Sequence, residues 1–209
     1  GTGEFQRHAA GTRGCAFLEA GGILVESLAW LFAKTGDAGL IDAADSVVRY
    51  SFRHRDPETG LLENNPTETR WDKFTATSEI GVWANCLMRA ASLAGRPEWT
   101  GMAIDAVAAW TKRAFDPASG RFFGRLSVAG GTPIRDGKTT PYQPGEFADL
   151  WEPLFPTHDY PVSVAEACLS AYRIRNDRAF LDDAMRFADV IRMSLPARGG
   201  RGGYGEPYG

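Results

Sequence analysis

The stretch TGDAGLIDAA at residues 35–44 decides the fold, because its pattern returns at residues 94–103 and 175–184. In each copy a polar residue closes a three-residue turn: Asp37, Arg96 and Asp177. A large apolar residue follows that polar residue by three positions, and an alanine follows it by seven: Leu40 and Ala44, Trp99 and Ala103, Phe180 and Ala184. A mostly apolar stretch precedes every turn, and an amphipathic stretch follows it. The repeat therefore predicts three helical hairpins that bury their apolar faces against one another.

The two helices of each hairpin differ in character. The first helices carry small and apolar residues on several sides, which is typical of helices buried all round. The second helices are one-sided, with apolar residues at intervals of three and four and charged residues between them. We expect an inner layer of buried helices and an outer layer of amphipathic ones. The predicted hairpins cover about residues 15–55, 78–115 and 161–195.

Two long loops connect the hairpins, at about residues 55–77 and 116–160. Loops of this length inside a compact domain are usually functional or disordered, and the many aromatic residues of the second argue against disorder. The second loop also predicts a small β-hairpin at 122–136, around the turn Ala129-Gly130-Gly131. Both loops lead into the first helix of a hairpin, so we expect them on one face, where we place function.

Length and composition predict a single domain spanning residues 1–209, and the repeated hairpins predict that it is all-helical. The chain is 44% hydrophobic, with 23% charged residues and a net charge of −3. These values give no sign of a nucleic-acid partner, which demands a clustered positive face. No apolar run reaches the roughly 20 residues that a membrane span needs. No signal peptide is visible in this chain, and the compartment stays open.

The cysteines predict no disulfide framework and no metal site. Cys15, Cys86 and Cys168 are odd in number, far apart and without a Cys-x-x-Cys pair. No two histidines stand at a helical metal-ligand spacing. We expect neither a metal nor a cofactor.

The first two hairpins end in the same phrase, Asp56-Pro57-Glu58-Thr59-Gly60-Leu61-Leu62 and Asp116-Pro117-Ala118-Ser119-Gly120-Arg121-Phe122-Phe123. Repeated hairpins with long loops on one face, closed by such turns, resemble the alpha/alpha-toroid superfamily, the six-hairpin glycosidases. That superfamily includes glycoside hydrolases, sugar epimerases and polysaccharide lyases. The resemblance implies a substrate funnel on the loop face. No single family's catalytic signature is matched.

The chain departs from that pattern in having three hairpins where the toroid has six. It therefore resembles half a toroid: a fragment of a longer chain, a shorter open variant, or a protomer that completes its ring by self-association. An open half-ring would leave apolar flanks at both ends, which favours a partner.

The repeat places an acid near the start of each inner helix. Glu19 lies 18 residues before Asp37, and Asp159 lies 18 before Asp177. Glu79 lies 17 residues before Arg96 in the middle unit, and Glu206 would open a fourth unit. Glycoside hydrolysis needs a pair of carboxylates, and toroid symmetry would aim these at one funnel. Acids in a first helical turn also serve as caps and complement the helix dipole, so a structural role is the alternative.

The long loops supply the other candidates. We assign possible catalytic roles to one loop acid, two inner-helix acids and two neighbours that would orient them: Asp72, Glu79, Asp159, His158 and Tyr160. Tryptophans suit sugar stacking, and charged neighbours suit sugar hydroxyls. The substrate-binding candidates are Trp71, Trp83, Trp151, Arg70, Glu19, Glu152 and Glu206.

The sequence favours hydrolysis of an oligo- or polysaccharide, because both loops hold more acids than cations. A polysaccharide lyase that uses His158 or Tyr160 as its base stays open. So does a sugar epimerase. A non-catalytic helical repeat that binds a glycan or a protein is the alternative outside enzymes.

Overall fold

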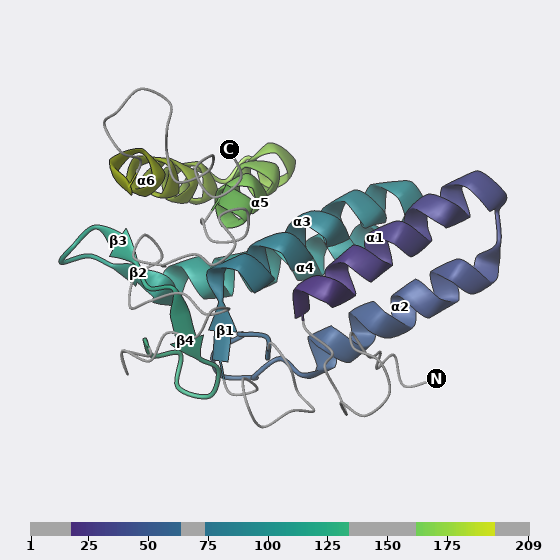
Figure 1. Ribbon diagram of the computed structural model, residues 1–209, viewed down its shortest axis with the longest axis horizontal. Helices are drawn as coiled ribbons and strands as arrows, with labels where there is room; N and C mark the ends of the chain where they lie inside the picture. Colours follow the sequence, from purple (N-terminus) through teal and green to yellow (C-terminus); the bar gives the residue numbers. More distant parts are fainter. Residues whose placement is uncertain (1–17, 64–73, 134–161, 195–209) are drawn as a thin grey trace, which may run out of the picture.

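The computed structural model describes residues 18–63, 74–133 and 162–194 (Figure 1). Six helices lie in these ranges, and they form three consecutive hairpins. Their bounds are α1 Leu18–Thr35, α2 Ala38–Arg53, α3 Thr77–Ala94, α4 Pro97–Ala114, α5 Val162–Arg175 and α6 Arg178–Ser194. The three predicted hairpins are confirmed.

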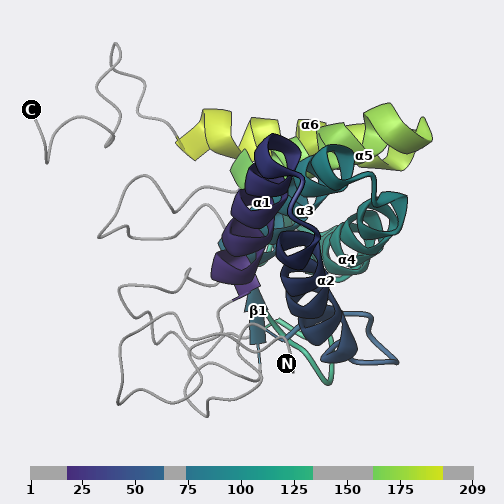
Figure 2. The same ribbon diagram turned by 90° about the vertical axis from the view of Figure 1, so that its right-hand side faces the viewer.

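The first helix of each hairpin belongs to an inner layer. Helix α3 packs between α1 and α5, and each inner helix also packs against the outer helix that follows it. Figure 2 shows α2 and α4 on the same side of α1 and α3. The predicted division into inner and outer helices is therefore confirmed.

The turns between paired helices share one backbone geometry. Their central residues Gly36, Gly95 and Asn176 have φ angles of +72°, +64° and +53°. This left-handed conformation is the usual way to end a helix. Asp37 and Asp177 then cap the next helix, because their carboxylates accept the backbone N–H of Gly39 and Ala179. Arg96 makes no side-chain cap, and Pro97 starts α4 instead.

Two glycines bring the inner helices close together. A Cβ on Gly22 of α1 would lie 2.7 Å from Cα of Trp83 in α3. A Cβ on Gly81 of α3 would lie 2.3 Å from Oγ of Ser163 and 2.6 Å from the backbone N of Val164 in α5. Both glycines stand fifteen residues before the residue that closes their turn. The repeat thus uses the same small residue at the same place to join successive inner helices.

The repeated Asp-Pro phrases fold into matching turns. Asp56 and Asp116 each accept the backbone N–H two residues on, at 2.9 and 3.2 Å. Gly60 and Gly120 close the turns with φ angles of +74° and +72°. An isolated bridge joins Arg55 to Leu62 after α2. Strands β2 (Phe115–Asp116) and β3 (Arg121–Phe122) pair in the same register after α4.

A second pair of strands links the two loops. Strand β1 (Phe74–Ala76) runs antiparallel to β4 (Arg125–Ser127), with Thr75 opposite Leu126. The β-hairpin predicted at 122–136 is therefore corrected in part. Its turn forms, because Leu126 and Pro133 make an isolated bridge. Its predicted first strand is divided into β3 and β4, and β4 pairs mainly with β1. Residues 134–136 lie outside the described part of the chain.

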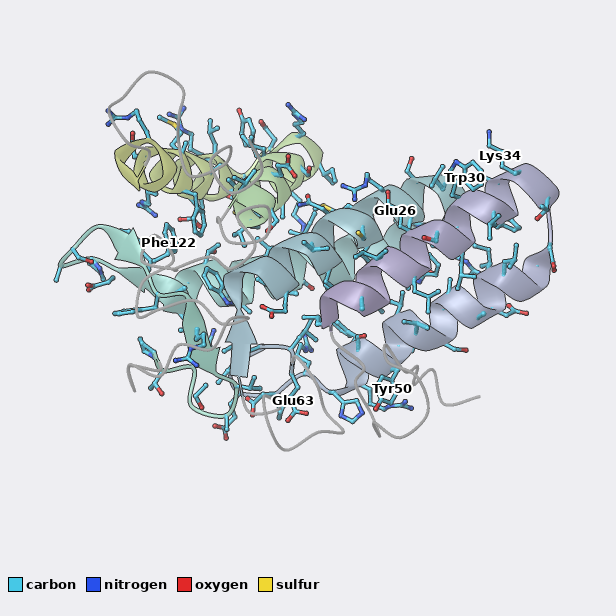
Figure 3. The ribbon with its side chains drawn as sticks, viewed as in Figure 1. Glu26, Trp30, Lys34, Tyr50, Glu63 and Phe122 are labelled. Atoms are coloured by element: carbon cyan, nitrogen blue, oxygen red, sulfur yellow. The ribbon has the colours of Figure 1, made fainter. Side chains whose placement is uncertain are left out.

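Aromatic rings fill the core between α4, α6 and the second turn. Trp110 of α4, Phe122 of β3 and Phe187 of α6 are fully buried, and the two Phe ring centroids lie 3.8 Å apart. Figure 3 shows Phe122 at this junction of the strands with α6. Burial of such rings is the main stabilising contribution of the core. Within the described ranges, no helix combines the length and apolar character needed to cross a membrane.

The glycine contacts generate a stability prediction. Gly81→Ala should lower the free energy of unfolding by about 1–3 kcal/mol, because its Cβ would collide with the α5 backbone. Gly101→Ala in α4 is the matched control, because a Cβ at this position would meet nothing within 4 Å. This variant should raise the free energy of unfolding by up to about 1 kcal/mol. Urea unfolding measures both values. Equal stabilisation by the two alanines would contradict the close approach of α3 and α5.

Candidate functional site

The described part of the loop face is built around the start of α3. Strand β1 runs directly into this helix, so pairing with β4 fixes where α3 begins. Glu79 lies in the first turn of α3 and is only 8% exposed. The helix dipole favours a negative charge at this position. In the described part of the loop face, Glu79 is therefore a buried carboxylate on an inner helix.

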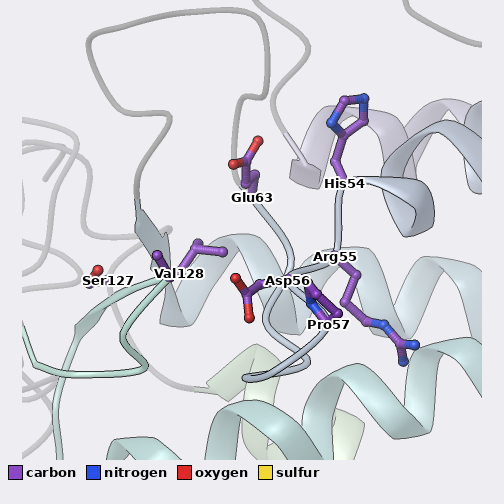
Figure 4. A pocket seen from close by; sticks show the side chains of 8 residues that line it. His54, Arg55, Asp56, Pro57, Glu63, Ser127 and Val128 are labelled. Carbon is purple, nitrogen blue, oxygen red and sulfur yellow. The ribbon is translucent and has the colours of Figure 1, made fainter.

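A pocket of about 570 Å³ opens beside the β1–β4 ladder (Figure 4). Its size suits a small ligand. The wall comes from the end of α2, the first Asp-Pro turn and the turn after β4: His54, Arg55, Asp56, Pro57, Glu63, Ser127, Val128 and Ala129. In Figure 4 the Asp56 side chain points toward the β4 side of the pocket and the Arg55 side chain points away.

Hydrogen bonds hold the two turns of this pocket together. The Asp56 carboxylate accepts the backbone N–H groups of Glu58 and Thr59 at 2.9 and 2.7 Å. The hydrogen bond from the Thr59 backbone is the largest cause that lowers the pKa of Asp56 below its usual value, and the bond from the Glu58 backbone adds to it. The Thr59 hydroxyl donates to the Val128 carbonyl at 2.8 Å in a buried contact. The first loop and the turn after β4 therefore form one rigid wall.

Each polar residue of the pocket is held in place by a different contact. His54 is the C-cap residue of α2, and its ring lies 4.8 Å from that of Tyr50. The Arg55 guanidinium lies 4.4 Å from the Phe52 ring. The Glu63 backbone N–H donates to the His54 carbonyl at 3.4 Å. Two carboxylates and an imidazole thus line a cavity that can bind hydroxyl groups.

An ion pair joins the inner helices α1 and α3 further along their length. Arg89 of α3 donates to both carboxylate oxygens of Glu26 in α1, at 2.6 and 2.7 Å. The hydrogen bond from Arg89 lowers the pKa of Glu26, and partial burial opposes it. Burial raises the pKa of the neighbouring Cys86 thiol to about 12, so this cysteine stays protonated at neutral pH.

Most of the predicted site residues lie outside the described part of the chain. These are Arg70, Trp71, Asp72, Trp151, Glu152, His158, Asp159, Tyr160 and Glu206. Glu19 stands in the first turn of α1, and its side chain is outside the described part. Of the remaining two, Glu79 is buried at the loop face, as described above, and Trp83 lies one turn further along α3.

Trp83 corrects one expectation. Its side chain is fully buried in α3, where the close approach of Gly22 covers its backbone. A ring without exposed surface offers no face to a sugar, so Trp83 serves the core. Its indole N–H has no hydrogen-bond partner among the described residues. Sequence reasoning read an aromatic residue near the loop face as a platform, and only the packing of α1 on α3 shows otherwise.

Sequence reasoning missed the pocket and the ion pair. His54, Glu63 and Val128 lie around one pocket because Thr59 donates to the Val128 carbonyl, a contact between residues 69 apart that leaves no local pattern. Glu26 and Arg89 are 63 residues apart and carry no motif. In the described ranges, no group of three or more His, Cys, Asp or Glu residues has a geometry that could hold a metal ion.

Comparison with known proteins finds similarity in structure alone. No family model matches the chain, and no curated protein sequence matches it. Cellobiose 2-epimerase from Bacillus thermoamylovorans aligns with a TM-score of 0.63 at 13% identity, over 95% of this chain and 47% of its own. A GH76 alpha-mannanase from Bacteroides thetaiotaomicron aligns with a TM-score of 0.58 at 14% identity, over 86% of this chain and 45% of its own.

The chain shares the helical-hairpin fold, an alpha/alpha toroid, of these solved structures. A sugar epimerase from a ruminal bacterium, with a TM-score of 0.61 and 13% identity, covers 91% of the chain in the same way. The chain spans less than half the length of these proteins, 45% in the case of the ruminal epimerase. The resemblance seen in the turn phrases is therefore confirmed at the level of the fold.

The Thr59 contact predicts how firmly the pocket wall is held. Thr59→Val should cost about 1–2 kcal/mol of stability, because the Val128 carbonyl loses its buried donor. Ser119→Ala at the matching position of the second turn is the control. The Ser119 hydroxyl donates to Asp116 in an exposed contact, so its loss should cost about 0.5 kcal/mol or less. Equal losses of stability in the two variants, measured by thermal unfolding, would contradict a stabilising role for the Thr59–Val128 hydrogen bond.

The Glu26–Arg89 pair predicts a pH-dependent contribution. Because the folded-state pKa of Glu26 is lowered, its stabilisation is present above the unfolded pKa of about 4.3 and is lost as pH falls through the folded value. Glu26→Gln should therefore destabilise the chain at pH 7 and much less at pH 3. For a solvent-accessible pair we expect about 1 kcal/mol at most.

Urea unfolding of wild type and Glu26→Gln at the two pH values measures this difference. Arg89→Gln is the partner control and should remove the same pH-dependent part. A gap between wild type and variant that is equal at pH 7 and pH 3 would contradict the assignment.

Proposed function

We propose that the chain is part of a carbohydrate-active enzyme that hydrolyses glycosidic bonds of a neutral oligosaccharide. The buried carboxylate of Glu79 carries the proposal, because it stands in the first turn of an inner helix on the loop face. The toroid fold supports it, since structural neighbours include glycoside hydrolases. The proposal concerns the whole catalytic unit, of which this chain spans one part.

The proposed chemistry uses two carboxylates on opposite sides of the scissile bond. One carboxyl group protonates the leaving oxygen, and the other acts as nucleophile or activates water. We assign Glu79 the acid role, because its carboxyl group is buried in the first turn of an inner helix on the loop face. Asp72 and Asp159 are our candidates for the second group. His158 and Tyr160 would orient these acids or the substrate.

Sugar binding is assigned to the aromatic and charged residues of the loops. Trp71 and Trp151 would stack against sugar rings. Arg70, Glu19, Glu152 and Glu206 would bind hydroxyl groups. The pocket beside β4 adds Asp56 and Glu63, and its two carboxylates favour a neutral sugar over an acidic one.

Manno-oligosaccharides are the first substrates to test. An inactive variant of an alpha-1,6-mannanase from Salegentibacter sp. that aligns with the chain, with a TM-score of 0.58 and 14% identity, binds alpha-1,6-mannotetrose. That ligand is neutral, which agrees with the acidic character of the loops and the pocket.

The experiment incubates the chain with alpha-1,6-mannotetrose and other neutral oligosaccharides and follows the release of reducing ends. Glu79→Gln should lower kcat about 100-fold to 10,000-fold, the usual contribution of a general acid. Glu98→Gln is the matched control, because Glu98 occupies the first turn of outer helix α4 and is exposed. Glu79→Gln with full activity would refute the acid role. Full activity in Asp72→Asn and Asp159→Asn as well would refute the site.

Epimerisation is the second candidate, because the solved structures that align with the chain include sugar epimerases, with TM-scores of 0.61 and 0.63. Cellobiose separates the two reactions: an epimerase changes the sugar without changing the mass of the disaccharide, whereas a hydrolase splits it. An ultraviolet-absorbing unsaturated product from an acidic glycan would instead indicate a lyase. Binding without any turnover would favour a glycan-binding module.

A further inference from the structure

Two buried residues of the described ranges carry a charge, and their charges are opposite. Glu79 of α3 is 8% exposed, and Arg125 of β4 is 4% exposed. The other buried polar residues of these ranges are neutral: Ser51, Thr59, Asn85 and Thr111. A charge that leaves water loses its hydration, and this loss is costly unless a group of opposite charge lies beside it. Each of the two buried charges therefore needs a compensating charge close by.

The β1–β4 ladder brings the Arg125 side chain to the start of α3. Ala76 of β1 and Arg125 of β4 stand directly opposite each other in the register. Opposite residues of an antiparallel pair project from the same side of the sheet, with Cβ atoms about 4.5–5.5 Å apart. Figure 1 shows β4 beside β1 at the point where α3 begins. The Arg125 side chain therefore starts next to the residue that precedes α3.

Glu79 approaches the same residue from the helix. Strand β1 ends at Ala76 and α3 begins at Thr77, so Glu79 is the third residue of the helix. The side chain of a glutamate at this position reaches back toward the residue before the helix, as in a capping box. A carboxylate there also complements the helix dipole. The Glu79 carboxylate and the Arg125 guanidinium thus converge on the backbone of Ala76.

The other described acids around the two loops need the Arg125 charge less. Asp56, Glu63 and Asp116 are half-buried, so water still hydrates their carboxylates. Asp56 and Asp116 also accept backbone N–H groups within their own turns. Glu79 is the buried acid of the described ranges, and it stands one helical turn from the residue opposite Arg125.

The described cations beside the first Asp-Pro turn have other contacts. The Arg113 guanidinium donates to two backbone carbonyls, those of Ala109 and Glu58, at 3.3 and 3.2 Å. The exposed Arg55 guanidinium lies over the Phe52 ring. Neither side chain is buried. Burial, register and charge thus single out the same two residues, one from each long loop region.

We propose that Arg125 is a positioning residue of Glu79, and that its guanidinium pairs with the Glu79 carboxyl group where β4 meets the start of α3. The pair fixes one carboxyl oxygen and leaves the other for the substrate. Its catalytic role rests on the hydrolysis proposed above. When Glu79 gives its proton to the leaving oxygen and the bond from that oxygen to the sugar breaks, a buried carboxylate remains. The guanidinium stabilises the negative charge that develops there.

Urea unfolding of the 209-residue chain tests the pair without any substrate. Arg125→Met keeps most of the side-chain length and removes the charge, whereas Arg125→Lys keeps the charge. With Glu79 in place, Arg125→Met should lower the urea midpoint by about 1 M or more, because it leaves a buried carboxylate without its partner. Arg125→Lys should lower the midpoint less. Circular dichroism checks that each variant keeps its helices.

The same two substitutions are repeated in the Glu79→Gln chain. There the order should reverse, because a lysine is then a buried charge without a carboxylate, whereas methionine is neutral. Glu79→Gln and Arg125→Met together should also cost less than the sum of the two single losses. Glu79→Gln with Arg89→Gln is the control, because Arg89 pairs with Glu26 and these two losses should add. If Arg125→Met does not fold, Arg125→Lys alone decides, since it should cost more in the Glu79→Gln chain than in the wild type.

Additive losses, or the same order of lysine and methionine in both chains, would overturn the proposal and assign the two charges to different partners. Kinetics separate the pair from the proposed reaction. On an oligosaccharide that the chain hydrolyses, Arg125→Lys should lower kcat and leave KM unchanged, whereas a raised KM at unchanged kcat would make Arg125 a substrate-binding residue. Coupling between the two residues in a chain that hydrolyses none of the oligosaccharides would keep the pair and refute the hydrolysis.

Discussion

The close approach of successive inner helices is the constraint on which the remaining structure depends. Gly22 lets α1 contact the Trp83 backbone, and Gly81 lets α3 contact α5 at Ser163. A larger side chain at either place would separate the backbones, because the atoms that a Cβ would meet include backbone. Since the same repeat position makes both contacts, the three inner helices lie in the same direction and in register. Their first turns consequently meet at one face.

The described parts of the two long loops contact each other at that shared face. The two Asp-Pro turns have the same backbone form, and the Thr59 hydroxyl ties the first to the strand region of the second loop. Strand β1 then carries the chain from this region into α3. A carboxylate at the start of α3, such as Glu79, therefore rests on a helix whose origin is held by the sheet. Such a rigid position suits a catalytic group better than a free loop does.

The repeat in the sequence predicted much of this arrangement. Spacing from the turn-closing residues predicted the six helices, their division into two layers and the face to which the acids belong. Asp37 and Asp177 are caps whose role follows from residue type and position. Glu79 was found because the alignment of units placed an acid there. The catalytic roles of Glu79, Asp72, Asp159 and their neighbours stay predictions.

The sequence by itself determined the hairpins, because a helix period and a turn are local properties that a short window of residues expresses. The tertiary structure alone decided which side of a helix is covered. It buried Trp83, brought Arg89 to Glu26 and paired β1 with β4. These outcomes depend on contacts between residues far apart in the chain, which leave no local pattern. Among the described hairpins the middle one has a neighbour on each side, since α3 packs against both α1 and α5, and this too is decided by contacts far apart in the chain.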